Sequence, residues 1–128
     1  MNRLFCNILA DSVSPVAEFY ERTFGMRRHF DSDWFVLLVH DDLPGHEYGI
    51  LQRDADIVPE HARTAFGGCL ITFVVADCRE AFARAEQYGA EVVEPPRLMP
   101  YGQLRALVRD PAGTLIDISS PADDEAGG

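Results

Sequence analysis

The chain has 128 residues, of which 47% are hydrophobic, and this length suits one compact domain better than two. Its formal net charge is −10 and its Lys and Arg residues form no run, so the composition argues against a nucleic-acid partner. No apolar stretch approaches the ~20 residues that cross a bilayer, and the start MNRLFCNILADS lacks a signal-peptide core, so we expect a soluble, cytoplasmic protein without a membrane partner.

The first half of the chain predicts a strand, a helix and three more strands. An apolar strand opens the segment 4–26, and a helix follows in which we expect Ser14 as N-cap and Pro15 as first helical residue. Gly25 is expected to end this helix in the left-handed conformation. Turn-forming residues then separate three strand-like segments, 27–30, 34–39 and 48–52.

The second half repeats this plan. The segment 69–90 again reads as a strand, an Ala-Asp corner and an amphipathic helix, with Asp77 and Glu80 resembling a capping box. Gly89 is placed to end this helix. Three strand-like segments follow at 91–93, 103–109 and 114–119. The residues 53–68 connect the two halves, and the small acidic tail 122–128 is predicted to be disordered.

The order βαβββ twice over, the helix end EFYERTFGM and the turn and strand VRDPAGTLIDI together resemble the vicinal oxygen chelate superfamily. This group holds glyoxalases, extradiol dioxygenases, and bleomycin and other antibiotic resistance proteins. The resemblance covers roughly residues 3–120 and implies an α+β fold, the glyoxalase/bleomycin resistance fold. One domain, 1–121, would hold two tandem βαβββ modules, 1–60 and 67–121, whose half-barrel sheets surround a cup-shaped cavity. The resemblance also implies a homodimer.

Enzymes of that family hold a divalent metal with four side chains from the first and last strands of the modules. The resemblance puts Phe5 at the first ligand position and Cys69 or Leu70 at the third, and none of these is the usual His or Glu. Glu47 is near the second position, but we assign it to a turn. The strand itself offers only Gly49, Ile50 and Leu51. Only Asp117, at the fourth position, keeps a suitable oxygen ligand, so we expect no metal and no cofactor.

Alternation along strands predicts which side chains share the cavity with these positions. Asn7 joins Phe5, Thr72 and Val74 join Leu70, and Leu115 and Ser119 join Asp117. Aromatic residues are candidates for stacking on a planar ligand, and Arg105 for pairing with an acidic ligand group or with Asp117. The predicted ligand-binding residues are therefore Phe5, Asn7, Trp34, Tyr48, Leu70, Thr72, Tyr101, Arg105 and Asp117.

Each assignment has a structural alternative. Aromatic side chains such as Phe5, Trp34 and Tyr48 commonly fill cores, and Asp117 can be satisfied by an Arg or by water at the mouth of the sheet. The three cysteines form no CxxC pair and read as small buried hydrophobes. The four histidines follow no ligand spacing, and turn or surface positions explain them.

Three functions stay open at this stage. The first is metal-independent binding of a small organic molecule, such as an antibiotic or a metabolite. The second is an enzyme, either a glyoxalase-like lyase or dioxygenase with an atypical metal site, or a metal-free enzyme that uses Asp117 as acid or base. The third is a structural or regulatory dimer with a filled cavity. Because the ligand set is incomplete, the sequence favours binding, and it identifies no catalytic residue.

Overall fold

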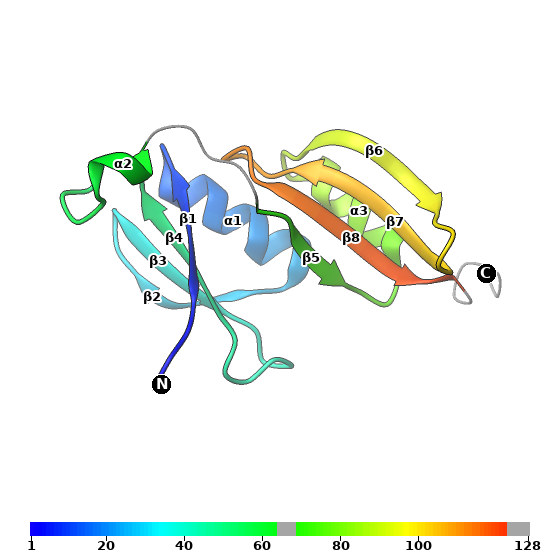
Figure 1. The fold of residues 1–128 in the computed structure, drawn as a ribbon, viewed down its shortest axis with the longest axis horizontal. Helices are drawn as coiled ribbons and strands as arrows, with labels where there is room; N and C mark the ends of the chain where they lie inside the picture. The colour runs from blue at the N-terminus through cyan, green and yellow to red at the C-terminus, as the bar shows by residue number, and fades with distance from the viewer. Residues whose placement is uncertain (64–68, 123–128) are drawn as a thin grey trace. The chain divides into compact units, whose positions relative to one another are not determined.

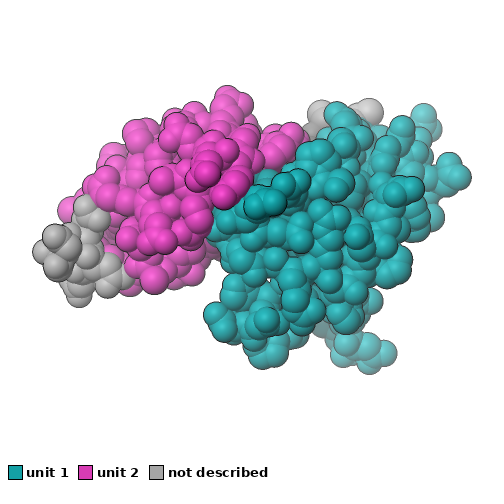
Figure 2. Space-filling view, turned by 180° about the vertical axis from the view of Figure 1, so that it is seen from behind, with its two compact units in different colours: residues 1–68 teal, residues 69–128 magenta. Residues whose placement is uncertain are grey.

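A computed structural model describes residues 1–63 and 69–122 of the chain. It divides into two compact units, Met1–Gly68 and Cys69–Gly128, which Figure 2 shows in different colours. Residues 64–68 of the predicted connector and residues 123–128 of the predicted acidic tail lie outside the described residues. None of the described helices has the length and apolar character that a bilayer crossing needs.

The first unit is a four-stranded sheet with one long helix (Figure 1). In the sheet order β1-β4-β3-β2, β1 runs parallel to β4 and the other pairs are antiparallel. A short helix, α2, follows the sheet and was not predicted from the sequence. The elements are β1 (Cys6–Ala10), α1 (Val13–Phe24), β2 (Arg27–Asp31), β3 (Phe35–Val39), β4 (Glu47–Gln52) and α2 (Glu60–Arg63).

The second unit repeats this topology with the sheet order β5-β8-β7-β6. Its first strand pairs in parallel with its last, as in the first unit, and both sheets remain open at two edge strands. The prediction of two tandem βαβββ modules is therefore confirmed. The elements are β5 (Ile71–Val74), α3 (Cys78–Gln87), β6 (Glu91–Leu98), β7 (Gln103–Arg109) and β8 (Leu115–Pro121).

Each unit builds its core between one helix and one face of its sheet. In the first unit, the fully buried rings of Phe19 and Tyr20 on α1 pack toward Leu38 and Ile50 of the sheet. In the second unit, the small residues of α3 lie against buried branched side chains of β7 and β8, which are Val108, Ile116 and Ile118. Full burial of such a side chain contributes about 1.5–3 kcal/mol. The helix thus covers one face of each sheet, and we call the other face the open face.

The start of α1 differs from the prediction. The helix begins at Val13 with Ser12 as N-cap, so Ser14 and Pro15 both lie inside its first turn. Proline is tolerated there because the N–H groups of the first turn have no partner within the helix. The predicted end is confirmed, since Gly25 has φ of 72° and caps the helix in the left-handed conformation.

The prediction for the start of α3 is confirmed at its N-cap. The Asp77 carboxylate accepts a hydrogen bond of 3.1 Å from the backbone N–H of Glu80, whereas the side chain of Ser12, the N-cap of α1, makes no capping hydrogen bond to its helix. Asp77→Ala should therefore lower the free energy of unfolding by about 1 kcal/mol, and Ser12→Ala should change it by less than half as much. Urea denaturation of both variants tests this, and equal losses would contradict it.

The strand β6 extends five residues beyond its predicted end at 93 and contains Pro95 and Pro96. Two prolines argue against a strand because they cannot donate to a ladder. Here β6 is an edge strand that pairs only with β7, and its register slips twice, between Val92 and Glu94 and between Glu94 and Arg97. The prolines fit because an edge strand needs donors on one side only, and the irregular register accommodates them.

Candidate ligand-binding site

Asp117 lies on the open face of the second unit, in the middle of β8. Its neighbours in the strand, Ile116 and Ile118, are fully buried on the side of α3. Thr72 of β5 is its partner across the parallel pair, and the Thr72 hydroxyl donates to Asp117 Oδ2 at 3.2 Å. The Ser119 hydroxyl donates to Oδ1 at 2.6 Å. The prediction that Thr72, Asp117 and Ser119 share one face is confirmed.

The hydroxyls of Thr72 and Ser119 explain how a carboxylate is accommodated in a strand of branched apolar residues. Asp117 is only 9% exposed, and burial of an unpaired carboxylate is costly. A carboxylate has about four acceptor positions. Hydrogen bonds from the described residues fill two of them, both from neutral hydroxyls on the same face. The acid is thus held in place and keeps acceptor capacity for a further donor.

Arg105 lies beside this group but does not pair with Asp117. It is the register partner of Ser119, and its guanidinium lies 3.8 Å from the Glu94 carboxylate. Glu94 is bound more closely by Arg97, at 2.6 Å, and this hydrogen bond holds the pKa of Glu94 below its usual range. Within the described part of the chain, the buried Nε of Arg105 has no hydrogen-bond partner. The Arg105 guanidinium therefore lies one residue pair away from Asp117.

Apolar side chains flank the Asp117 group on the edge strand of this sheet. Leu70, just before β5, is 51% exposed, and Val74 at the end of β5 is 72% exposed. Tyr101 lies in the turn between β6 and β7 and is 63% exposed. The open face of the second unit thus combines a fixed carboxylate, two hydroxyls, a guanidinium and accessible apolar surface.

In the first unit, Asn7 lies on the open face and Tyr48 does not. Asn7 is the register partner of Gly49, and its side chain lies over that residue so closely that a Cβ built on Gly49 would fall 2.2 Å from Asn7 Oδ1. Tyr48 is directed to the opposite face, where its hydroxyl lies 2.9 Å from the hydroxyl of Tyr20 on α1. The expectation that Tyr48 lines the ligand cavity is therefore corrected: it belongs to the core.

The other two aromatic candidates of the first unit lie just outside its strands. Phe5 precedes β1 and is half-buried, and the guanidinium of Arg3 stacks over its ring at 4.7 Å. Trp34 precedes β3, is 44% exposed and lies 6.0 Å from the ring of Phe35. Both are accessible at the rim of their sheet, and a role in ligand stacking stays a prediction for each.

The family positions in this chain do not fit a chelated divalent ion. The side chains of Phe5 and Leu70 have no atom that could bind a metal, and one carboxylate such as Asp117 binds a divalent ion only weakly by itself. Glu47, which we assigned to a turn, is the first residue of β4, but its carboxylate is paired with Arg3. Among the described residues, no group of three His, Cys, Asp or Glu side chains is placed to hold an ion.

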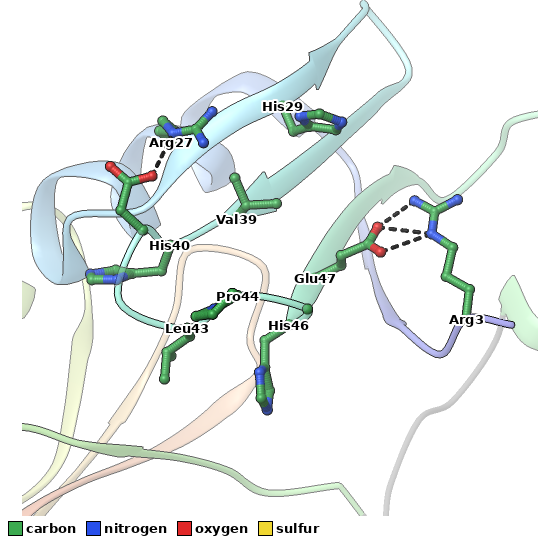
Figure 3. Close-up of a pocket in the computed structure, with 11 residues that line it drawn as sticks. Arg3, Arg27, His29, Val39, His40, Leu43, Pro44, His46 and Glu47 are labelled. Atoms are coloured by element: carbon green, nitrogen blue, oxygen red, sulfur yellow. Dashed lines mark hydrogen bonds and ion pairs between the residues drawn. The ribbon is translucent and has the colours of Figure 1, made fainter.

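A hollow on the first unit gathers three of the four histidines, which the sequence did not predict. It has a volume of about 550 Å3 and is lined by residues of β2, β3 and β4, by the turn between β3 and β4, and by Arg3 (Figure 3). His29 comes from β2, while His40 and His46 bracket the turn. The histidines follow no regular spacing in the sequence, and the antiparallel register of β2, β3 and β4 brings them to one hollow.

The three cysteines have different environments. Cys78 is fully buried at the start of α3, and burial raises the pKa of its thiol to about 11. Cys69 is half-buried, and Cys6 is exposed on the edge strand β1. The expectation that all three are buried hydrophobes therefore holds for Cys78 and is wrong for Cys6.

Residues 4–118 match the family model of the Glyoxalase/Bleomycin resistance protein/Dioxygenase superfamily. The chain belongs to this superfamily. The glyoxalase superfamily match covers both units, in agreement with the motifs at the end of α1 and at the turn before β8. No curated protein matches the chain.

Solved structures support the glyoxalase superfamily fold at low sequence identity. A glyoxalase-related enzyme from Fulvimarina pelagi has a TM-score of 0.78 at 18% identity, over 94% of this chain and 88% of that one. A glyoxalase/bleomycin resistance protein/dioxygenase family enzyme from Burkholderia phytofirmans PsJN has a TM-score of 0.78 at 19% identity. The match covers 91% of this chain and 96% of that one. A lactoylglutathione lyase from Agrobacterium tumefaciens has a TM-score of 0.66 at 20% identity, and the match covers 91% of each chain. The homodimer and the cytoplasmic location stay predictions.

Proposed function

We propose that this member of the glyoxalase superfamily binds a small organic molecule without a metal, on the open face of its second unit. The expected ligand has an ammonium or hydroxyl group that donates to Asp117, and an apolar body. The proposal rests mainly on the surroundings of Asp117. This carboxylate stands at a metal-ligand position of the family, and the hydroxyls of Thr72 and Ser119 hold it there.

The open face offers the chemistry that such a ligand needs. The carboxylate of Asp117 is fixed by two hydroxyls and would not need to be ordered when a ligand binds, which favours affinity. Leu70 and Val74 supply exposed apolar surface beside Thr72, where an aliphatic or aromatic body gains about 25 cal/mol for each Å2 buried. Arg105, the register partner of Ser119, can donate from its terminal amino groups to a second, acidic group of the ligand.

Benzylamine is a suitable probe because it joins an ammonium group to an apolar ring. Titrated into the labelled protein, it should shift amide signals of β5, β7 and β8. The Asp117→Asn variant should bind it about tenfold more weakly, because a charge-assisted hydrogen bond contributes about 1.5–3 kcal/mol. The same Asp117→Asn substitution should weaken the binding of benzyl alcohol less, because benzyl alcohol carries no charge.

Glu86→Gln is the matched control, since Glu86 is an exposed carboxylate on α3, the helix that covers the opposite face of the sheet. This variant should bind benzylamine like the wild type. Equal affinity of Asp117→Asn and wild type would contradict the proposal, as would shifts confined to α3.

A purely structural role for Asp117 is the competing account, since the same two hydroxyl bonds would also accommodate a carboxylate that binds no ligand. The thermal unfolding of Asp117→Asn separates the two accounts. Binding by Asp117 predicts a melting temperature near that of the wild type together with weaker benzylamine binding. A structural role predicts a clear loss of stability with unchanged affinity.

A further inference from the structure

A row of residues across three neighbouring strands lines the hollow on the first unit. Arg27 of β2 pairs in register with Val39 of β3, and Val39 pairs with Glu47 of β4. Register partners point to the same face, and for this row it is the face opposite Tyr48 and α1. Figure 3 shows Val39 between Arg27 on one side and the Glu47–Arg3 pair on the other. Leu43 and Pro44 of the turn line the hollow together with Val39.

Arg27 has unused hydrogen-bonding capacity at this hollow. Its Nε donates to Asp41 Oδ1 at 2.9 Å, and within the described residues its two terminal amino groups have no hydrogen-bond partner. The Arg27 and Asp41 side chains are 60% and 76% exposed, and exposed pairs contribute little to stability. An anion that offers two oxygens could therefore replace Asp41 at a small cost.

The other acid of the hollow is already neutralised. Glu47 accepts from Arg3 Nε at 2.9 and 3.0 Å and is also paired with the Arg3 terminal amino group. These bonds, with a smaller contribution from nearby His29, hold the pKa of Glu47 below its usual range. Glu47 is thus a paired anion. It leaves Arg27 and the histidines as the groups that determine which ligands the hollow prefers.

A β-bulge adds His29 to this group. The register of β2 against β3 shifts between Arg28 and Phe30, so His29 is an extra residue of the strand. Bulges commonly direct a side chain toward a site. The lining of the hollow contains two arginines, three histidines and two acids, of which Glu47 is paired with Arg3.

We propose that this hollow on the first unit is a second binding site, for a small organic anion with a short apolar tail. The carboxylate or phosphate head would bind the free amino groups of Arg27 and the imidazole of His29. The tail would lie on Val39, Leu43 and Pro44. The volume of about 550 Å3 is in the range of small-molecule sites.

Hexanoate is the probe, titrated at constant ionic strength and followed by amide shifts of the labelled full chain. Shifts should appear in β2 and in the turn between β3 and β4. Arg27→Gln should weaken binding about fivefold, and Asp41→Asn, which removes the competing acid, should strengthen it about threefold. Both residues are exposed, so both variants should fold.

Arg22 and Glu18 provide the matched control, because they form another exposed ion pair of the same unit, on α1. Arg22→Gln and Glu18→Gln should leave hexanoate binding unchanged. Weaker rather than stronger binding by Asp41→Asn would overturn the proposal. Hexylamine binding at the same residues as tightly as hexanoate would overturn it as well, because the site would then not select anions.

Discussion

Ser119→Ala is expected to lower the free energy of unfolding by about 2 kcal/mol. Ser119 is 5% exposed, and its hydroxyl donates to Asp117 at 2.6 Å, a short bond of the charge-assisted kind. Its removal leaves a nearly buried carboxylate with one donor fewer, and such a group costs about 1–3 kcal/mol. Thr72→Val should cost less, because its bond is 3.2 Å long and Thr72 is exposed. Urea denaturation monitored by circular dichroism measures both losses.

A double-mutant cycle shows whether this loss belongs to the carboxylate. In the Asp117→Asn background, Ser119→Ala should cost less than about 1 kcal/mol, because an amide is less expensive to leave unpaired than a carboxylate. The coupling between the two sites should then be at least about 1 kcal/mol. Additive losses would mean that Ser119 stabilises the strand through packing and does not hold Asp117.

Cys78 is expected to react with iodoacetamide at least about 100-fold more slowly than Cys6 in the folded protein at pH 8. The thiolate is the reactive form, and burial raises the pKa of Cys78 to about 11, so its thiolate fraction is very small at this pH. Cys78 is also fully buried, whereas Cys6 is exposed. Peptide mass spectrometry of samples taken over time gives both rates.

Denaturation in urea is the control for this labelling. Once unfolded, the two cysteines should react at similar rates, because the burial that separates them is lost. Fast labelling of Cys78 in the native protein would contradict the packing of α3 against β8, where Cys78 Sγ lies 3.3 Å from the carbonyl of Ile118.

The sequence predicted the fold well because its signals are local. Gly25 ends α1 as expected, Asp77 caps α3, and strand alternation placed Thr72 and Ser119 beside Asp117. The prediction was wrong where a tertiary setting outweighs the local signal. Pro95 and Pro96 lie in β6 because that strand is at an edge, which the sequence does not reveal.

The candidate sites were predicted less completely. Tyr48 was assigned to the cavity wrongly because β4 is buried on both sides over 48–51, so its burial does not alternate and the sequence pattern cannot tell the two faces apart. The hollow of Arg27 and His29 depends on the register across three strands and on a bulge. Neither feature has a signature in one sequence, so these residues appeared unrelated.

The central claim is that the Asp117 face binds its ligand without a metal. The most direct test is the affinity of benzylamine for the wild-type protein before and after dialysis against EDTA. Metal-independent binding predicts the same dissociation constant in both samples and no change on adding Mn, Ni, Zn or Fe ions. Loss of binding after EDTA, with recovery on adding one of these ions at one equivalent, would contradict it.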